Sequence, residues 1–214
     1  MTKNKIIVFD FDGTIADTLT GITISGNYAL SSLGFPQRTY EEFKMFIGDA
    51  ARITAMRALP DGYKDEEYIE KYFVTYRQHY FENQYKSIEL YSGIIELLEE
   101  LTKENKLAVL TNKNQDITDS LIEFLGIGKY FTQITGVTDG PVKPQPDVLW
   151  DIIKSNGFEV ADAIMVGDSA VDINTAKNAG VTSIGVSYGY GDVSGADCIA
   201  SSPKEILTAI NAMV

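Results

Sequence analysis

Short apolar segments alternate with helical patterns over most of this chain. The apolar runs, most of which lack polar alternation, lie at residues 5–9, 106–110, 131–137, 163–166, 182–186 and, more weakly, 198–200. Such runs are typical of strands buried on both faces of a parallel sheet. Helical patterns lie between them at 93–105, 115–125, 146–156 and 171–179, and a last helix begins at Ser202. This alternation predicts a doubly wound α/β fold.

Residues 16–88 interrupt the alternation, because they contain no convincing strand. Helices are expected there at 18–33, 39–46, 50–59 and 65–84, and Thr39 with Glu42 forms a capping box at the start of the second. We therefore expect an α/β core of residues 1–15 and 89–214 that carries the site, with a helical cap of residues 16–88. A helical insert that begins so close to the first strand end is well placed to act as a lid.

Composition and charge limit the possible partners. Hydrophobic residues make up 44% of the 214 positions and charged residues 22%, as in an ordinary globular protein. No apolar run approaches the roughly 20 residues that span a bilayer. The net charge of −12 argues against nucleic acid or an anionic membrane as a partner. The sequence fits either a monomer or a homodimer.

Two features of the chain favour a cytoplasmic location. The start, Met1-Thr2-Lys3-Asn4-Lys5, leads into an apolar run without the pattern of a cleaved signal peptide. The single cysteine, Cys198, leaves no internal disulfide and fits a reducing compartment.

The first apolar run ends in two aspartates, Asp10 and Asp12, followed by Gly13. Side chains at positions i and i+2 of an extended segment point the same way, so these carboxylates project together. Carboxylates this close repel each other unless a cation or a shared proton lies between them. Glycine lets the backbone turn sharply and lets a ligand approach its N–H. The pattern predicts a divalent metal site that contains a nucleophile.

Polar side chains also follow three later strands. Thr111 and Asn112 follow the second strand, Lys143 lies between prolines after the third, and Asp168 and Asp172 follow the fourth. Ligands of open parallel sheets bind beyond the carboxyl ends of the strands, so these groups are expected to share one crevice. Carboxylates suit Mg²⁺, and lysine with helix N-terminal amides suits phosphoryl oxygens. We expect a Mg²⁺-dependent site for a phosphorylated small molecule.

These segments resemble the haloacid dehalogenase superfamily in its phosphatase branch, most of all phosphoglycolate phosphatases and their relatives. Four motifs carry the resemblance, in the family's order and spacing: Asp10-Phe11-Asp12-Gly13-Thr14, Leu110-Thr111-Asn112-Lys113, Lys143-Pro144-Gln145-Pro146 and Gly167-Asp168-Ser169-Ala170-Val171-Asp172. The helical insert matches the family's cap in position and size. The resemblance implies a Rossmann-like core with an inserted cap. One departure is Tyr91-Ser92-Gly93, where relatives often carry proline before the glycine.

The resemblance also implies roles for the motif residues. Asp10 would attack phosphorus and form an aspartyl-phosphate, while Asp12 would protonate the leaving oxygen and then take a proton from water. Asp10, the carbonyl of Asp12 and Asp168 would bind Mg²⁺, with Asp172 orienting that shell. The residues expected to contact the phosphoryl group are Asp10, Phe11, Asp12, Gly13, Thr111, Asn112 and Lys143.

Substrate choice is expected to lie with the cap, near Gly48 and Arg52. Arg52 either binds a substrate carboxylate or lies on a solvated helix face. The leading expectation is a phosphatase for a small phosphomonoester, with 2-phosphoglycolate first.

Several other functions remain open. The family also contains pyrophosphatases, nucleotidases and sugar phosphomutases resembling β-phosphoglucomutase. Those mutases usually carry an acidic residue where this chain has Gly167. A dehalogenase would need no metal, so the retained Asp12 and Asp168 speak against it. Retention of every expected acid also speaks against a non-catalytic binding module.

Overall fold

A six-stranded parallel sheet forms the centre of the computed structural model, which describes residues 4–138 and 140–213. The first three residues of the chain, and Asp139 in the loop before Lys143, lie outside the described residues. The strand order is β5-β4-β1-β6-β7-β8, with β1 between β4 and β6. The strands are β1 (Ile6–Phe9), β4 (Lys106–Asn114), β5 (Gln133–Val137), β6 (Ala163–Gly167), β7 (Thr182–Val186) and β8 (Cys198–Ala200).

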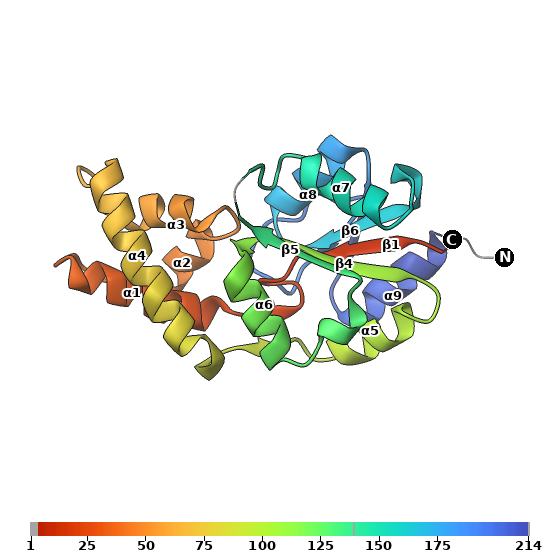
Figure 1. Ribbon diagram of the computed structural model, residues 1–214, viewed down its shortest axis with the longest axis horizontal. Coiled ribbons are helices and arrows are strands. Elements are labelled where there is room, and N and C mark those ends of the chain that lie inside the picture. Colours follow the sequence, from red (N-terminus) through yellow and green to blue (C-terminus); the bar gives the residue numbers. More distant parts are fainter. Residues whose placement is uncertain (1–3, 139, 214) are drawn as a thin grey trace.

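Helices cover both faces of this sheet (Figure 1). Ile6 and Val8 of β1 pack on the face covered by α7 (Asp147–Ser155) and α8 (Ala170–Ala179). Ile7 and Phe9 belong to the cluster on the other face, which is covered by α5 (Ile94–Leu101), α6 (Gln115–Phe124) and α9 (Pro203–Ala212). Successive side chains of a strand point to opposite faces, so a strand buried on both sides needs apolar residues throughout. The predicted doubly wound fold is confirmed.

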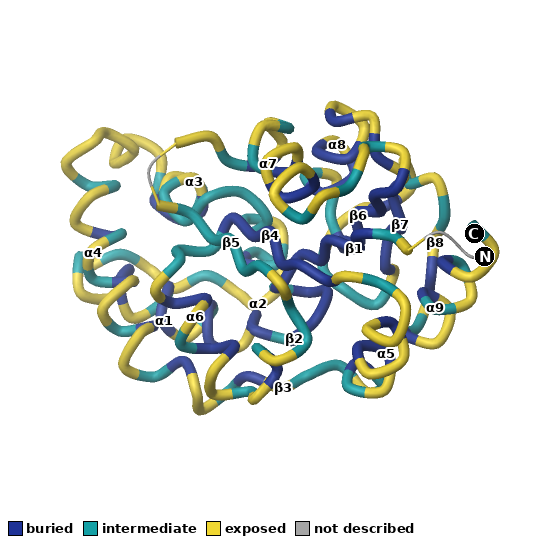
Figure 2. The backbone as a smooth tube through the Cα atoms, turned by 45° about the vertical axis from the view of Figure 1, so that its right-hand side comes forward, coloured by how far each residue is buried: buried dark blue, intermediate teal, exposed yellow. Residues whose placement is uncertain are grey.

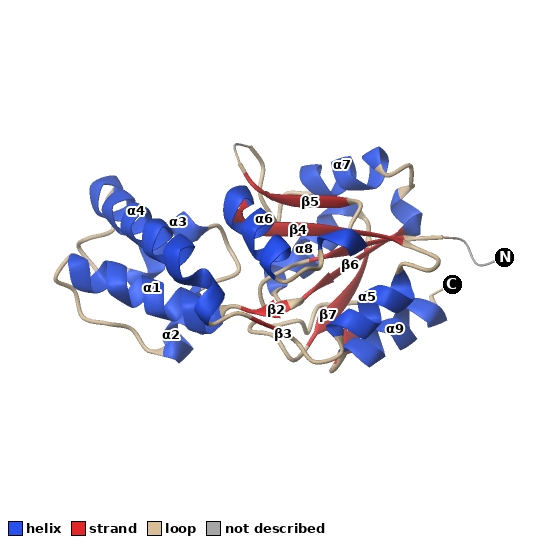
Figure 3. Cartoon of the chain, turned by 60° about the horizontal axis from the view of Figure 1, so that its bottom comes forward, coloured by secondary structure: helices blue, strands red, loops and turns tan. Residues whose placement is uncertain are grey.

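Four helices form a separate layer beside the sheet (Figures 1 and 3). They are α1 (Leu19–Ser32), α2 (Tyr40–Phe46), α3 (Ala51–Ala58) and α4 (Glu66–Asn83), and we call residues 19–83 the helical unit. The Thr39–Glu42 capping box is present at the start of α2. Tyr72, Tyr76 and Tyr80 are buried along one face of α4, with ring centroids 6.2 and 5.7 Å apart.

A short strand pair connects the helical unit to the sheet. β2 (Ala16–Asp17) pairs antiparallel with β3 (Glu89–Leu90), and both lie between the two layers (Figure 3). Sequence patterns did not predict this pair, because two residues are too few to show a period of two. Short 3₁₀ turns occur at η1 (Gln84–Lys86), η2 (Gly128–Tyr130) and η3 (Val160–Asp162).

Burial is greatest along the central strands (Figure 2). Every residue of β1 is buried, as is every residue of β6, so the strand ends that carry polar groups are held by a rigid core. Within the described ranges, no helix is both long enough and apolar enough to cross a membrane.

We predict that Gly26→Ala destabilises the protein. A Cβ at this position of α1 would lie 2.3 Å from Cζ of Phe43 and 2.8 Å from the Tyr72 hydroxyl. Replacing glycine in a helix normally stabilises by about 1 kcal/mol, but overpacking a core costs about 1–3 kcal/mol. Urea unfolding should therefore show a lower midpoint for Gly26→Ala than for the exposed α1 control Thr20→Ala. A Gly26→Ala protein more stable than the wild type would contradict this packing.

Candidate active site

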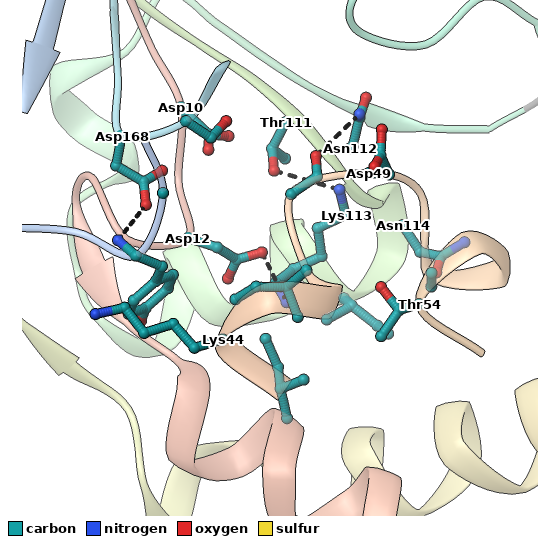
Figure 4. Close-up of a pocket in the computed structure, with 18 of the residues that line it drawn as sticks. Asp10, Asp12, Lys44, Asp49, Thr54, Thr111, Asn112, Lys113, Asn114 and Asp168 are labelled. Atoms are coloured by element: carbon teal, nitrogen blue, oxygen red, sulfur yellow. Dashed lines mark hydrogen bonds and ion pairs between the residues drawn. The ribbon is translucent and has the colours of Figure 1, made fainter. Parts of the chain in front are cut away.

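The polar groups at the carboxyl ends of β1, β4 and β6 meet at one edge of the sheet (Figure 4). Asp10 continues the β1 ladder, since its amide donates to the carbonyl of Val166 in β6 at 2.8 Å. This bond holds the Asp10 backbone next to the turn that carries Asp168. Asp10, Thr111 and Asp168 all line the same pocket and are each less than a tenth exposed.

Lys143 is the cation at the centre of the site. Its ammonium lies 2.8 Å from Oδ1 of Asp10 and 2.6 Å from Oδ1 of Asp172. The other Asp172 oxygen accepts from the amide and the hydroxyl of Ser169, at 3.1 and 2.7 Å. Asp172 is fully buried and caps the start of α8 through these contacts. Lys143 and Asp172 therefore form a fixed support behind Asp10.

Asn112 holds the loop that carries Lys143. Its side chain accepts from the Lys143 amide at 2.9 Å and donates to the Lys143 carbonyl at 3.0 Å. It also donates to the carbonyl of Gly48 in the helical unit, at 3.3 Å. The Asn112 side chain is thus engaged with backbone groups, which favours a positioning role over the predicted contact with phosphate.

Burial and mutual repulsion raise the proton affinity of the carboxyl groups. Burial and the neighbouring Asp172 charge raise the pKa of Asp10 to about 7, although Lys143 opposes this. Burial, Asp172 and Asp10 raise the pKa of Asp168 well above its ordinary range. Burial alone would lower the pKa of Lys143, but the attraction of Asp10 and Asp172 outweighs it and raises that pKa. With all three carboxyl groups ionised, the site would hold more negative charge than one ammonium balances, so the carboxyl groups of Asp10 and Asp168 keep their protons more readily than usual.

These donors fit a divalent cation. Asp10, Asp168 and Asp172 each offer a carboxylate oxygen, and the three oxygens lie within 4.8 Å of one another. Asp10 and Asp168 line the pocket, whereas Asp172 is fully buried behind them and pairs with Lys143 and Ser169, so Asp10 and Asp168 are the carboxylates that could reach a metal in the pocket. Within the described chain, no donor reaches the carbonyl oxygen of Asp12. Oxygen-only donors of this kind suit a hard cation.

The turn after Asp10 contains the expected glycine, but the amide of that glycine does not face a ligand. Gly13 has φ +78°, and a Cβ there would lie 2.2 Å from Oδ2 of Asp168, so only glycine fits. Its amide, however, donates to the carbonyl of Ala16 at 2.9 Å and is not directed at a ligand. The amides of Phe11 and Asp12 have no acceptor among the residues that the structure describes. They are the donors available to a phosphoryl group at this turn.

Asp12 lies between the core and the helical unit. Oδ1 of Asp12 accepts from the hydroxyl of Thr18 at 2.6 Å, and Oδ2 lies 3.1 Å from the Lys113 ammonium. That ammonium also lies 4.7 Å from the centroid of the Tyr80 ring on α4, and the Lys113 side chain is only 6% exposed. Tyr80 thus covers a lysine that faces the pocket from the core side.

The helical unit supplies the opposite wall of the pocket, through residues that include Lys44, Gly48, Asp49 and Thr54 (Figure 4). Gly48 therefore lies where the sequence placed it. Arg52 is not among the residues that line the pocket. Its guanidinium pairs instead with Glu66 and Glu70 on α4. Lys44 is the cation that this wall presents to the pocket.

Sequence reasoning missed Lys44, Lys113 and Tyr190, which all line the pocket. Lys113 directly follows Thr111 and Asn112, so the same motif contained it. Tyr190 follows β7, a fifth strand end to which the rule of ligand binding at strand ends also applies. Lys44 had no signal, because a single lysine on an amphipathic helix is typical of a solvated face.

The model of the haloacid dehalogenase-like hydrolase family matches residues 7–186. The chain belongs to this family. A phosphoglycolate phosphatase of Agrobacterium fabrum is 36% identical over 194 residues, which cover 89% of this chain and 83% of that protein. Another, from Vibrio parahaemolyticus, is 31% identical and covers 96% of both chains.

The solved structures show the same resemblance. A predicted phosphoglycolate phosphatase from Haemophilus somnus has a TM-score of 0.90 at 28% identity, and the match covers 98% of this chain and 99% of that one. The resemblance drawn from the four motifs is confirmed, and the chain is a hydrolase of the phosphoglycolate phosphatase-like type.

We predict that the metal-free protein loses stability as the pH rises from about 4 to 7. Asp10 has a pKa of about 7 in the folded state against an ordinary 3.8, so the folded state holds more protons over this range. The free energy of unfolding then falls with rising pH, by a few kcal/mol in total. Urea unfolding in chelator should show this slope in the wild type and a smaller one in Asp10→Asn. Equal slopes in the two proteins would show that Asp10 is not the source of the pH dependence.

Proposed function

We propose that this protein is a Mg²⁺-dependent phosphatase that hydrolyses a small phosphomonoester, with 2-phosphoglycolate as the leading candidate. The observation that carries the proposal is that Asp10 and Asp168 line the pocket, with Asp12 beside them and Lys143 buried against Asp10. A carboxylate nucleophile, a fixed cation and a second carboxylate at the leaving-group side are what phosphoryl transfer through a covalent intermediate needs.

The proposed reaction has two displacement steps. A carboxylate oxygen of Asp10 attacks phosphorus, the bond to the leaving oxygen breaks, and Asp12 gives that oxygen a proton. Water then attacks phosphorus, Asp12 takes its proton, and the bond between phosphorus and Asp10 breaks to release inorganic phosphate. The positions of Asp10 at the strand end and Asp12 two residues later, facing the helical unit, suit these roles.

Charge on the phosphoryl oxygens would be held by the surrounding donors. Thr111 lines the pocket, the Lys143 ammonium lies 2.8 Å from Oδ1 of Asp10, and the amides of Phe11 and Asp12 have no acceptor among the described residues. Preorganised donors of this kind typically contribute about 10²–10³ in rate each.

The metal would be held by Asp10, the Asp12 carbonyl and Asp168, while Asp172 orients the group through Lys143 and Ser169. When bound, Mg²⁺ supplies positive charge that offsets the repulsion between Asp10 and the phosphoryl group.

We further propose that residues 16–88, which contain the helical unit, form a cap domain over a core of residues 1–15 and 89–214. Its contacts with the core include Asn112 with Gly48 and Lys113 with Tyr80, both at the pocket. Closure over the site would exclude bulk water and limit substrate size, which supports a small metabolite as substrate. With one cysteine in the chain, a cytoplasmic location belongs to the same proposal.

Position 167 supports a phosphatase over a sugar phosphomutase. A Cβ on Gly167 would lie 2.3 Å from Cβ and Cγ of Asp172, so a side chain there would displace the carboxylate that supports Lys143. The acidic residue that the mutases usually carry at this position has no room in this structure.

The charges of the pocket support an anionic leaving group. Lys113 and Lys44 both line it, from the core and from the helical unit. No described residue forms an ion pair or a hydrogen bond with the Lys44 ammonium, which is therefore available to a ligand. The relatives from Agrobacterium fabrum and Vibrio parahaemolyticus are phosphoglycolate phosphatases, and 2-phosphoglycolate carries a carboxylate next to its phosphoryl group.

We predict that phosphate release from a panel of phosphoesters will require Asp10 and a divalent metal. The panel contains 2-phosphoglycolate, pyrophosphate, sugar phosphates and nucleotides. Turnover should be greatest with 2-phosphoglycolate and Mg²⁺, and Asp10→Asn or chelation should lower it by at least about 10³-fold. Thermal unfolding with Mg²⁺ and a phosphate mimic checks that the variant still folds and binds.

Two results of this assay would contradict the proposal. Greatest turnover with pyrophosphate or a nucleotide would reject 2-phosphoglycolate as the substrate. Isomerisation of a sugar phosphate in the presence of a bisphosphate, without net hydrolysis, would reject the phosphatase itself.

A second prediction concerns substrate charge. Lys44→Met should raise KM for 2-phosphoglycolate about tenfold, because a charge-assisted contact is lost, and should affect its uncharged carboxamide much less. The matched control is Arg52→Met, which removes a cation of the same helical unit that pairs with Glu66 and Glu70. If Arg52→Met alone lowers the preference for the carboxylate, Arg52 and not Lys44 recognises the leaving group.

A further inference from the structure

Helix α1, the first helix of the proposed cap domain, is not capped by the side chain of its N-cap residue. Thr18 occupies the N-cap position of α1 but makes no side-chain capping bond. Its hydroxyl donates instead to Asp12, at 2.6 Å. A helix start leaves backbone amides that need acceptors from elsewhere. The contact between Thr18 and the proposed acid–base residue thus leaves the α1 start to be satisfied by another group.

Tyr190 accepts from the first two amides at the start of α1. Its hydroxyl oxygen accepts from the amide of Thr18 at 2.7 Å and, together with Oδ1 of Asp17, from the amide of Leu19, with both distances 3.2 Å. The same hydroxyl donates to Oδ1 of Asp17, at 2.7 Å. A phenol offers one proton and two lone pairs, so all of its hydrogen-bonding capacity lies at the junction between β2 and α1. Tyr190 comes 172 positions after Thr18, on the loop that follows β7.

The backbone of Tyr190 is fixed at the metal-binding end of the core. Its amide donates to Oδ2 of Asp168 at 2.7 Å, and the amide of Gly191 donates to the Asp168 carbonyl at 3.2 Å. A Cβ on Gly189 would lie 2.3 Å from Cβ of Asp168 and 2.4 Å from the Gly13 carbonyl oxygen. This loop therefore packs against the Asp168 turn without space for movement.

We infer that Tyr190 is a positioning residue that sets the start of the cap's first helix relative to Asp168. Tyr190 contacts both parts: its hydroxyl accepts from the Thr18 amide at the start of α1, and its amide donates to the Asp168 carboxylate. The orientation of α1 then depends on the geometry of the Asp168 turn. Only the catalytic consequence of this inference rests on the proposed function; the structural link does not.

The direct test is hydrogen exchange at the α1 start in Tyr190→Phe, which removes the hydroxyl and keeps the ring. We expect exchange of the Thr18 amide to be about tenfold faster because it loses its acceptor, and exchange of the Leu19 amide to change less because Oδ1 of Asp17 still accepts from it. The matched control is Tyr188→Phe, since Tyr188 lies on the same loop but donates to the Thr14 carbonyl, at 2.9 Å. Exchange that is unchanged in Tyr190→Phe, or equally fast in both variants, would overturn the inference.

A double-mutant cycle tests the link to Asp168. Asp168→Ala removes the acceptor of the Tyr190 amide, so it should also speed exchange at Thr18. Combined with Tyr190→Phe it should add little, because both changes act through one residue. Fully additive effects would show that Tyr190 caps α1 without transmitting the position of Asp168, and would overturn the coupling.

Steady-state kinetics on the substrate that the panel identifies test the consequence for catalysis. Tyr190→Phe should raise KM about tenfold while kcat stays within about threefold, because the cap is less often correctly placed but the reacting groups are intact. A fall in kcat at constant KM would overturn the positioning role. Because exchange is measured without substrate, a protein that hydrolyses no phosphoester would reject the proposed function and leave the exchange result standing.

Discussion

The balance between three buried carboxylates and one buried ammonium determines the organisation of this protein's site. Asp10, Asp168 and Asp172 would repel each other strongly in a dry interior, and Lys143 compensates only part of that charge. Asp10 and Asp168 directly follow the fully buried strands β1 and β6, while Asp172 lies in the first turn of α8 and Lys143 on the loop after β5. A parallel sheet converts this placement into a site, since all of its carboxyl ends face one way.

The same charge balance explains why the supporting residues are so constrained. Ser169 and Lys143 take both oxygens of Asp172, and Asn112 fixes both backbone groups of Lys143. Gly13 and Gly167 leave room for the carboxylates where any side chain would collide with them. The carboxylates are thus held by neighbours that are themselves fixed by hydrogen bonds, which is how preorganisation appears in a static structure.

Sequence patterns were most informative where polarity changes abruptly. Each predicted core strand is present, because a run of apolar residues buried on both faces has few alternatives, and the polar residues at its end mark the site. Strand β4 alone extends well beyond its predicted end, through an irregular register between Leu110 and Asn114.

What the patterns could not show was the choice of partner. The Gly13 amide bonds to Ala16, the Asn112 side chain to the Lys143 loop, and Arg52 to two glutamates of α4. Each of these residues has a group that could bind a ligand, but in the structure that group is already bonded to another residue of the protein. The sequence did not indicate Tyr190, because its partner Thr18 lies 172 positions away. A tyrosine between two glycines also has no charge and belongs to no hydrophobic repeat that would indicate a site.

The dependence of α1 on Tyr190 also bears on the order in which the chain is made. The helical unit is complete at residue 83, long before the loop after β7 is synthesised. Thr18 and Tyr190 are separated by 172 residues, which a ribosome adds in about 10–30 s at typical rates. Throughout this interval the nascent α1 lacks the tyrosine hydroxyl that accepts from its first amides. The last third of the polypeptide therefore completes an element formed at its beginning, and the pocket is assembled only when both have left the ribosome.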